Sequence, residues 1–346
     1  PTRLKMIKNK RFSNAINKVP QKVPPIWFMR QAGRYHSHYQ GLRKKHSFVE
    51  LCKEPQLAAE VAMGPINDFD YDVAILFSDI LFPLESLGLK LDYKPGPIFE
   101  NLLTPDSLKN LDSSDKIVDD MKFQAKALSL TREALSESKS LVGFVGGPWT
   151  LLSYGTGIKN EISVKDIHKN EFFEKLLYDV LIPSLRSIIQ MQLENNAEIV
   201  YMFDTNAAQL ESKYFTDKYI EEIKQTIFSA FPNQVAYFCK ENPILNDPKS
   251  NLKYQLAGMV YGKNEGLETI LPKIEEGFLQ GNFDPKNLLL PENEFQFQVD
   301  KFINTFLDLN PSERSGWVCS LSHGVLPKAQ EENVRYFIES VRSDFR

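Results

Sequence analysis

Short apolar runs alternate with longer amphipathic stretches along most of this chain. Eight of the short runs are rich in β-branched and aromatic residues, a composition that favours β-strands. In chain order they are Pro25–Met29, Val73–Phe77, Leu141–Val145, Glu198–Phe203, Gln234–Cys239, Leu256–Val260, Gly277–Gln280 and Gly316–Leu321, of which the seventh shows the weakest pattern. Helical periodicity marks the stretches between them, such as Val49–Asp68, Ser107–Ser136, Asn170–Asn195, Thr216–Ala230 and Glu331–Ser343.

Strands that alternate with helices form parallel sheets, because each helix carries the chain back to the start of the next strand. Eight such repeats match a closed (β/α)8 barrel, the TIM-barrel architecture, better than an open doubly wound sheet. The length of 346 residues suits one such barrel or two smaller domains, and no linker divides the sequence. We therefore predict an α/β protein with a single (β/α)8 barrel domain over residues 25–346, after a basic N-terminal segment over residues 1–24.

The composition is that of a globular protein with a large core, at 42% hydrophobic and 25% charged residues. The three cysteines, Cys52, Cys239 and Cys319, form an odd set without Cys-x-x-Cys spacing, which suits a reducing compartment. No apolar run approaches the roughly 20 residues of a membrane span, and the start of the chain lacks the apolar segment of a secretory signal. We expect a cytoplasmic protein. Met6 is a candidate for the natural first residue, in which case Pro1 to Lys5 are not native.

Charge is distributed unevenly along the chain. No Asp or Glu precedes Glu50, whereas Lys and Arg occur twelve times in that part; with an overall net charge of −4, the remainder carries about −16. A basic front suits nucleic acid, anionic lipid, an acidic small molecule, an organelle transit segment or simply a solvated positive face. Charge alone favours the solvated face. Nucleic-acid binding is not predicted, because no recognisable DNA or RNA module accompanies the basic residues.

Polar side chains follow several of the predicted strands. They are Arg30 and Arg34 after the first strand, Asp79 after the second, Tyr154 after the third, Asp204 and Thr205 after the fourth, and His323 after the eighth. Each one alone is most simply a solvated loop residue or, for Asp79, a helix cap. In a barrel, however, all of these loops meet at the C-terminal mouth, where such enzymes carry out their chemistry.

Five segments resemble, in the same order, the signature segments of the uroporphyrinogen decarboxylase family. They are Pro25–Tyr35 (PIWFMRQAGRY), Phe77–Leu81 (FSDIL), Gly143–Leu151 (GFVGGPWTL), Gln280–Pro285 (QGNFDP) and His323–Pro327 (HGVLP). The resemblance extends from Pro25 to about Val341. It implies a single barrel domain, a homodimer and removal of the four acetate carboxyl groups of uroporphyrinogen III to give coproporphyrinogen III, in tetrapyrrole biosynthesis.

The resemblance also implies which residues act. Arg30, Arg34, Asp79, Tyr154, Thr205 and His323 match the family's substrate-binding positions, and Arg43 is a further candidate for a substrate carboxylate. Catalytic roles fall on Asp79, Arg30 and Tyr154, while His323 is assigned to binding. Permanently charged guanidinium groups suit a substrate with eight carboxylates, because they bind carboxylates bidentately.

Decarboxylation needs an acceptor for the electron pair that carbon dioxide leaves behind. No pyridoxal, thiamine or pyruvoyl site is apparent, so no cofactor and no metal are predicted, and the substrate itself must supply the acceptor. Protonation of a pyrrole carbon gives a cationic ring that accepts these electrons. One enclosed carboxylate, Asp79, can stabilise that cation while it accepts the central pyrrole N–H bonds.

Three segments depart from the family pattern, and two other functions stay open. Asp204-Thr205 stands where the family usually has Glu-Ser, Met259–Asn264 replaces a Gly-Leu-Asp-Trp segment, and His36-Ser37-His38 replaces a Leu-Pro-Glu-like run. The alternatives are a zinc- or corrinoid-linked methyltransferase of the same superfamily and a non-catalytic tetrapyrrole-binding protein. The methyltransferase would need a His-x-Cys zinc pair, which does not occur in this sequence.

Overall fold

A computed structural model describes residues 6–109, 114–158 and 164–346. The strands are β1 (Val73–Ile75), β2 (Leu91–Tyr93), β3 (Pro97–Phe99), β4 (Ser140–Gly146), β5 (Ile199–Phe203), β6 (Val235–Phe238), β7 (Gly258–Val260), β8 (Phe278–Phe283) and β9 (Trp317–Leu321). Residues 1–5, which were considered as not native, lie outside the described residues. The same holds for residues 110–113 of the predicted helix Ser107–Ser136.

Helices separate most of these strands. The α-helices are α1 (Lys10–Ile16), α2 (Ser37–Arg43), α3 (Phe48–Lys53), α4 (Pro55–Phe69), α5 (Phe82–Glu85), α6 (Ser114–Asp120), α7 (Lys122–Ala134), α8 (Pro148–Thr156), α9 (Val164–Lys169), α10 (Glu171–Glu174), α11 (Ile182–Glu194), α12 (Ser212–Tyr214), α13 (Ile220–Ile223), α14 (Ser250–Tyr254), α15 (Leu267–Ile270), α16 (Glu292–Leu307) and α17 (Glu331–Asp344). Shorter 3₁₀ turns are η1 (Pro105–Leu108), η3 (Thr205–Gln209), η6 (Leu271–Lys273) and η7 (Pro285–Leu289), and π-helical turns are η2 (Lys175–Leu181), η4 (Phe215–Tyr219) and η5 (Lys224–Phe228).

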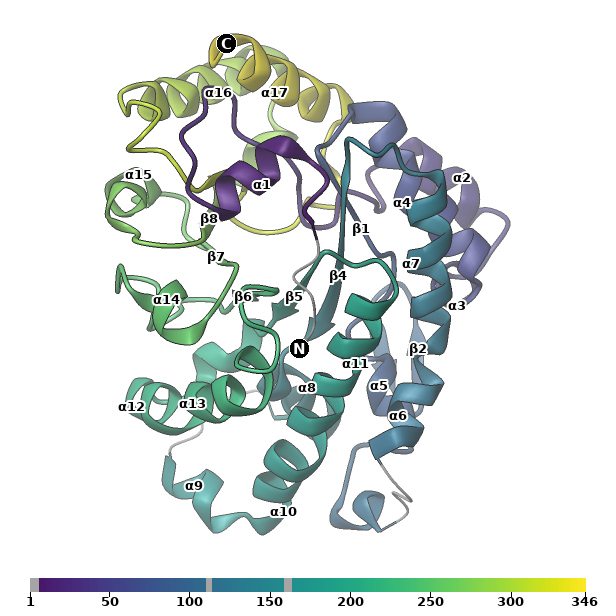
Figure 1. Ribbon diagram of the computed structural model, residues 1–346. Helices are drawn as coiled ribbons and strands as arrows, with labels where there is room; N and C mark the ends of the chain where they lie inside the picture. Colours follow the sequence, from purple (N-terminus) through teal and green to yellow (C-terminus); the bar gives the residue numbers. More distant parts are fainter. Residues whose placement is uncertain (1–5, 110–113, 159–163) are drawn as a thin grey trace.

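Seven parallel strands form the central sheet in the order β1-β4-β5-β6-β7-β8-β9, so each strand lies beside the next one in the chain. The sheet curls, and the helices surround it (Figure 1). The gap between β9 and β1 is filled by the segment at Ile26, which forms a parallel bridge with Cys319 and accepts a hydrogen bond from the Asp72 backbone at 3.0 Å. The predicted (β/α)8 barrel is confirmed, and the segment around Ile26 occupies the position of its first strand.

The first predicted strand, Pro25–Met29, is wrong as a regular strand, since it forms only the single bridge at Ile26. Pro24 and Pro25 have no N–H group to donate to a ladder. The N–H of Ile26 goes to a side chain instead, Asp72 Oδ2 at 2.8 Å. The other seven predicted strands are present, although β1 and β7 are shorter than their apolar runs.

The predicted helix Val49–Asp68 is two helices, α3 and α4, which meet at Glu54. Glu54 is extended, with φ −86° and ψ 109°, because the ring of the following Pro55 disfavours the helical conformation in the residue before it. Asn170–Asn195 and Thr216–Ala230 are helical as predicted, with π-helical turns inside them. The last predicted helix, Glu331–Ser343, corresponds to α17.

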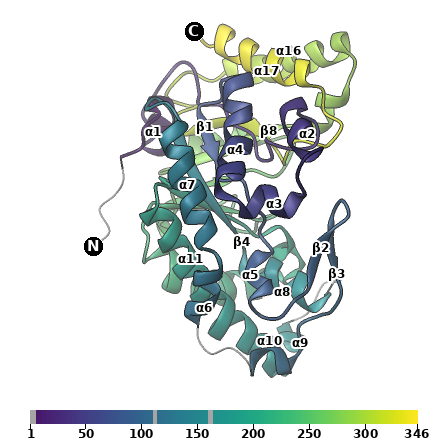
Figure 2. The ribbon, with the colours of Figure 1, turned by 90° about the vertical axis from the view of Figure 1, so that its right-hand side faces the viewer.

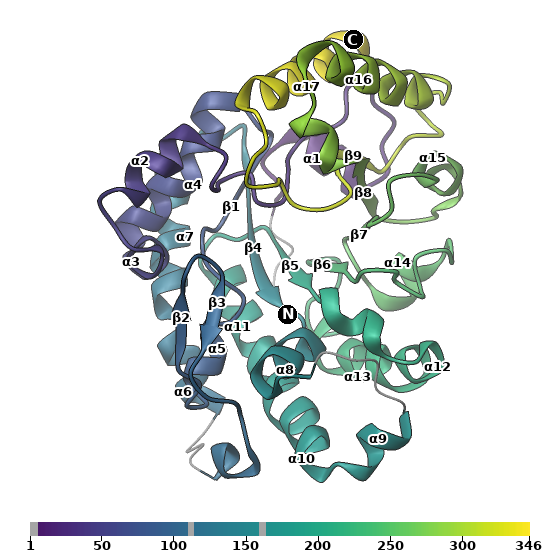
Figure 3. The same cartoon turned by 180° about the vertical axis from the view of Figure 1, so that it is seen from behind.

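A two-stranded antiparallel hairpin between β1 and β4 was not predicted from the sequence. Its strands, β2 and β3, pair with Tyr93 opposite Pro97 across a turn at Pro95-Gly96. Figure 2 shows the hairpin on the side of the molecule opposite to α1, and Figure 3 shows it in front of the barrel together with α8. The hairpin therefore stands at one end of the barrel and α1 at the other.

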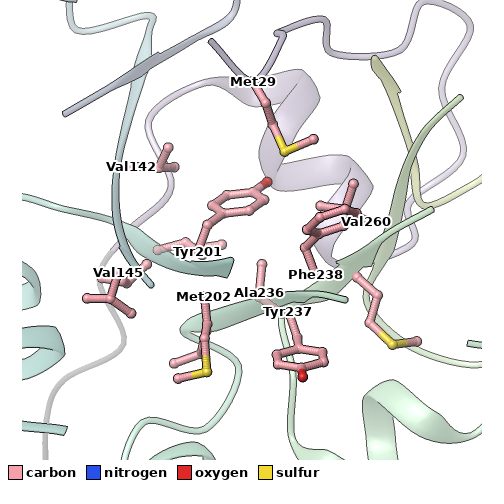
Figure 4. Packing of buried hydrophobic residues seen from close by; sticks show 14 of the residues in the cluster. Met29, Val142, Val145, Tyr201, Met202, Ala236, Tyr237, Phe238 and Val260 are labelled. Atoms are coloured by element: carbon pink, nitrogen blue, oxygen red, sulfur yellow. The ribbon is translucent and has the colours of Figure 1, made fainter. Parts of the chain in front are cut away.

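The barrel interior is filled by alternate side chains of the strands. Tyr201 points inward towards Met29, whereas its neighbour Met202 points with Tyr237 to the opposite side of the sheet (Figure 4). The Tyr201 ring makes an edge contact with Trp27 at 5.0 Å, and its hydroxyl donates to Gln280 Oε1 at 2.8 Å. This packed layer closes the barrel beneath its C-terminal mouth, so it is not an open channel.

Candidate active site

A cavity of about 420 Å³ opens at the carboxyl ends of the barrel strands. All seven residues that the sequence predicted for the site line it: Arg30, Arg34, Arg43, Asp79, Tyr154, Thr205 and His323. They come from five different segments of the chain, and only the closure of the barrel brings them together. The cavity is large enough for a sizeable organic ligand.

Three arginines bring positive charge to the cavity. Arg30 and Arg34 come from the loop that follows the segment around Ile26, and Arg43 ends α2. None of the three has an acidic partner within 4.0 Å among the described residues, whereas Arg342 pairs with Asp70 at 2.7 Å elsewhere on the molecule. The Arg43 side chain donates only to a backbone carbonyl, that of His46 at 2.6 Å. Charges without acidic partners suit an anionic ligand.

Arg30 occupies its place by an unusual backbone conformation. Its φ of 59° lies in the left-handed region, which few residues other than glycine adopt. Its side chain lies against the backbone of Gly324, where an added Cβ would lie 2.6 Å from Arg30 Cδ. The adjoining Val325 N–H donates to the Met29 carbonyl at 2.9 Å, which joins the first and last loops. Gly324 is thus needed for Arg30 to reach the cavity.

Asp79 is the single acidic residue in the cavity lining of the described chain. Its Oδ1 accepts a hydrogen bond from the Leu81 N–H at 2.8 Å, which fixes the carboxyl group in the turn before α5. Burial raises the pKa of Asp79, and the Leu81 N–H and the charge of Arg30 lower it in part. Asp79 is therefore not the cap of α5, whose N-cap residue is Leu81 without a side-chain cap, and the Asp79 carboxyl group forms a local turn before the helix while it lines the cavity.

Aromatic rings form the floor of the cavity. Phe203 at the end of β5 lies 5.9 Å from Phe144 and 6.4 Å from Phe238, both of which also line it. His323 contacts Phe238 edge-on at 6.0 Å. Burial lowers the pKa of His323, as do the positive charges of Arg30 and Lys240, so its imidazole is neutral near pH 7. An apolar aromatic floor beside exposed arginines suits a ligand with ring faces and acidic arms.

Tyr154 and Thr205 lie on the remaining side of the cavity. Tyr154 projects from α8 and is 37% exposed, with its ring 6.1 Å from Phe99 of the hairpin. Thr205 begins η3 directly after β5. Its neighbour Asp204 is fully buried and is not part of the cavity lining.

Asp204 instead fixes the start of α8. It accepts hydrogen bonds from Thr150 N at 3.0 Å, Thr150 Oγ1 at 2.9 Å, Tyr219 at 2.5 Å and Tyr237 at 3.0 Å. Burial raises its pKa, and these donors lower it in part. The four hydrogen bonds offset the cost of burying the Asp204 carboxylate, and they fix the helix that carries Tyr154.

Two of the cavity residues that were not predicted as site residues, Gly324 and Tyr93, position the charged groups of the site. Gly324 was quoted within a motif but given no role, and Tyr93 was not noticed because it belongs to the hairpin. The Pro95-Gly96 turn between Leu91–Tyr93 and Pro97–Phe99 was the available signal, since Pro-Gly between short apolar runs indicates a hairpin.

No group of three or more His, Cys, Asp or Glu side chains within residues 6–109, 114–158 and 164–346 is arranged to hold a metal ion. Cys319 is fully buried and lies outside the cavity lining, whereas His323 lies within it. Cys319 and His323 therefore do not share the cavity. Within the same ranges, no helix is long and apolar enough to cross a membrane.

Residues 7–343 match the sequence profile of the family described as uroporphyrinogen decarboxylase. The chain belongs to this family. It is 35% identical to the uroporphyrinogen decarboxylase of Campylobacter jejuni subsp. jejuni serotype O:23/36, with 96% of this chain and 98% of that protein covered. The enzyme of the same name from Trichlorobacter lovleyi is 31% identical at the same coverage, and that from Myxococcus xanthus is 32% identical over 96% of each chain.

Solved structures confirm the fold. A methyltransferase from Methanosarcina mazei superposes with a TM-score of 0.74 at 18% identity, and 99% of each chain is covered. A putative vitamin-B12-independent methionine synthase from Listeria monocytogenes gives a TM-score of 0.52 at 12% identity over 94% of this chain. Identities this low support a shared fold and carry nothing about activity.

Proposed function

We propose that the cavity binds uroporphyrinogen and removes carbon dioxide from its acetate arms to give coproporphyrinogen. The observation that carries this proposal is a single carboxylate, that of the half-buried Asp79, in a cavity with three arginines that have no acidic partners among the described residues. A ligand with several carboxylates complements the arginines. Pyrrole N–H groups, which converge at the centre of a folded macrocycle, complement the carboxylate.

The arginines bind the arms of the substrate. Arg34 and Arg43 are exposed at the rim, where they can take propionate or acetate groups bidentately. Arg30 lies close enough to Asp79 to lower its pKa, so it is placed to hold the acetate that reacts. Thr205 and His323 are hydrogen-bonding partners for further carboxylates. The neutral imidazole that burial favours at His323 can donate one such bond.

Asp79 stabilises the charge that develops during the reaction. Protonation of a pyrrole carbon makes the ring cationic, the acetate C–C bond then breaks to release carbon dioxide, and its electron pair neutralises the ring. A second proton converts the resulting methylene into a methyl group, and loss of the first proton from the pyrrole carbon restores the aromatic ring, so that one proton in total replaces carbon dioxide. Opposite charges about 4 Å apart at an effective dielectric near 20 attract by roughly 4 kcal/mol, which is worth about a thousandfold in rate if realised in the transition state.

Two residues can deliver the protons. Arg30, beside the reacting acetate, can pass a proton from solvent through an ordered water, and Tyr154, which also lines the cavity, carries a hydroxyl group that can donate one. We assign catalytic roles to Asp79, Arg30 and Tyr154 on this basis.

The proposal extends to the whole protein. Every residue that lines the cavity falls within residues 29–327, so the barrel domain, residues 25–346, supplies the site and the basic segment 1–24 is accessory. Ile98 and Leu102 are exposed near the hairpin, at 43% and 48%, and suit the homodimer expected of the family. Tetrapyrrole synthesis from a charged substrate suits a cytoplasmic location.

The deciding experiment is turnover by Asp79→Asn and Asp79→Glu. Asparagine preserves size and one hydrogen-bonding oxygen but removes the charge, so we expect kcat to fall about a hundredfold or more while substrate binding and the melting temperature change little. Glutamate should recover activity only partly, because a carboxylate displaced by one methylene misses the pyrrole N–H groups. The measurements are kcat, substrate Kd and melting temperature for both variants.

Near wild-type turnover by Asp79→Asn, or simple unfolding, would remove Asp79 from the mechanism. Conversion of uroporphyrinogen by the wild-type protein after treatment with a chelator is the accompanying control. Loss of turnover that zinc restores would favour the methyltransferase-like alternative instead.

A further inference from the structure

The β2–β3 hairpin contributes Tyr93, Pro95, Gly96 and Pro97 to the lining of the active-site cavity, and of these four only Tyr93 has a polar side chain. Its ring lies 4.6 Å from Phe48 and 6.2 Å from Phe82, so it is held between α3 and α5. Tyr93 and Phe48 both line the cavity that contains Asp79. The hairpin is therefore anchored by this ring, and the hydroxyl at its far end is delivered to a defined place.

The Tyr93 hydroxyl is buried and makes no hydrogen bond of normal geometry to any residue in the described part of the chain. A buried hydroxyl without a partner is destabilising, so such a group normally has a purpose. Asp79 is close enough for its negative charge to raise the pKa of Tyr93, although burial is the larger cause. The hydroxyl needs an acceptor, and the nearby carboxylate is one.

The Oδ2 atom of Asp79 is available to accept this hydrogen bond. Leu81 N–H donates to Oδ1, and no described residue donates to Oδ2 with normal geometry. The other ionisable neighbours are Arg30, Glu85 and Cys52. Glu85 is paired with Lys53 at 2.6 Å, and Cys52 is fully buried with its pKa raised by burial and by Asp79. None of them donates a hydrogen bond to the carboxylate.

We propose that Tyr93 is a positioning residue for Asp79: its hydroxyl donates a hydrogen bond to Oδ2 and thereby keeps the carboxylate ionised and directed into the cavity. This inference rests on the role proposed above for Asp79. A hydrogen bond to the charged form of an acid stabilises that form and lowers its pKa. Burial acts in the opposite direction at Asp79, so Tyr93 offsets a cost that the enclosed site itself creates.

The test is Tyr93→Phe, which keeps the ring packed on Phe48 and Phe82 and removes only the hydroxyl. Without the bond the pKa of Asp79 rises, so the carboxylate becomes protonated at higher pH and activity is lost earlier as the pH falls. We expect the acidic limb of the kcat/KM profile to move upward by about one pH unit, the shift that loss of one hydrogen bond to a charged group produces. At the plateau KM should stay within about twofold.

A second readout does not depend on turnover. The carboxyl group of Asp79 can be followed by carbon NMR in protein labelled at aspartate carboxyl carbons, with the signal identified by its absence in Asp79→Asn. Its midpoint should rise by a similar amount in Tyr93→Phe. Tyr71→Phe is the matched control, because the Tyr71 hydroxyl is likewise buried without a hydrogen-bond partner in the described chain, but Tyr71 lies outside the cavity lining.

The outcomes separate this inference from the proposed function. If wild-type protein does not decarboxylate uroporphyrinogen, the proposed function fails, and the NMR titration still decides whether Tyr93 controls Asp79. An unchanged Asp79 midpoint in Tyr93→Phe overturns the inference even when wild-type turnover is normal. Should the phenylalanine variant lower the melting temperature, Tyr93→Leu provides a second variant without the hydroxyl for the same titration.

Discussion

Single side chains in this protein are distinguished by their partners more than by their type. Arg34 reaches the cavity without an acidic neighbour within 4.0 Å in the described structure, while Arg132 approaches Glu198 at 3.6 Å and Arg342 binds Asp70 and Asp72. The paired arginines stabilise the fold. The unpaired ones keep their charge available for a ligand, which is why the same residue type serves two purposes.

This difference predicts distinct effects of two charge deletions. Arg34→Ala should raise the KM for uroporphyrinogen by roughly 10- to 100-fold, the loss expected for a charged hydrogen bond to a substrate carboxylate. Lys10→Ala, an exposed residue of α1 at the other end of the barrel, should change little beyond the salt dependence of kcat/KM. Steady-state kinetics at two ionic strengths measures both.

Equal effects of the two substitutions would show that substrate is attracted by diffuse charge and not bound by Arg34.

At the scale of elements, helices α2 and α4 are joined by a contact that the family pattern did not suggest. His36, the residue before α2, is fully buried, and its Nε2 lies 2.5 Å from Asp68 near the end of α4. The other ring nitrogen, Nδ1, has no partner among the described residues. His38 follows on α2, packed on the backbone of Gly64, where an added Cβ would lie 2.3 Å from its ring. This contact anchors the segment that connects Arg34 with Arg43.

Asp68→Ala should therefore lower the free energy of unfolding by about 1 to 2 kcal/mol, because it leaves a buried imidazole with both nitrogens unpaired. In a His36→Leu background the same change should cost much less, since leucine has no polar atom to leave without a partner. Chemical denaturation of the two single variants and the double variant gives the coupling energy.

Additive effects in that cycle would mean that His36 and Asp68 do not stabilise one another.

For the whole molecule, closure of the barrel depends on Asp72. This carboxylate, 2% exposed, accepts hydrogen bonds from Ile26 N at 2.8 Å and Asn9 Nδ2 at 3.1 Å, and lies 3.3 Å from Arg11 and 3.5 Å from Arg342. The Asp72 side chain thus connects the segment around Ile26, the segment around α1 and the C-terminal helix α17 to the start of β1. These contacts of Asp72 replace the strand-to-strand hydrogen bonds that the segment with Pro24 and Pro25 cannot make.

We expect Asp72→Asn to lower the free energy of unfolding by about 3 kcal/mol, because an amide brings donors to a buried site already filled with donors. Asp70→Asn is the matched control two residues away. Asp70 also pairs with Arg342 and with Lys139, but its side chain is 68% exposed, so its loss should cost about 1 kcal/mol or less. Urea denaturation measures both variants.

A similar small effect of both substitutions would show that the barrel closes without help from the Asp72 carboxylate.

Much of this molecule was predictable from short-range features of the chain. Strands two to eight follow from apolar runs, because a buried parallel strand must be apolar on both faces. Six of the seven site residues could be named because they match substrate-binding positions of the family, and a barrel gathers the loops that follow its strands at one mouth whatever those loops contain.

Other features were decided only when distant segments met. Whether Asp79 touches a tyrosine depends on where the β2–β3 hairpin folds back, and Tyr93 is 14 residues away along the chain. Asp204 looked like a site residue beside Thr205, yet its four donors come from α8, η4 and β6 and hold it away from the cavity. Hydrophobic periodicity reports which residues are buried, whereas the partners of a buried polar group are fixed by tertiary packing, because they come from elements far apart in sequence.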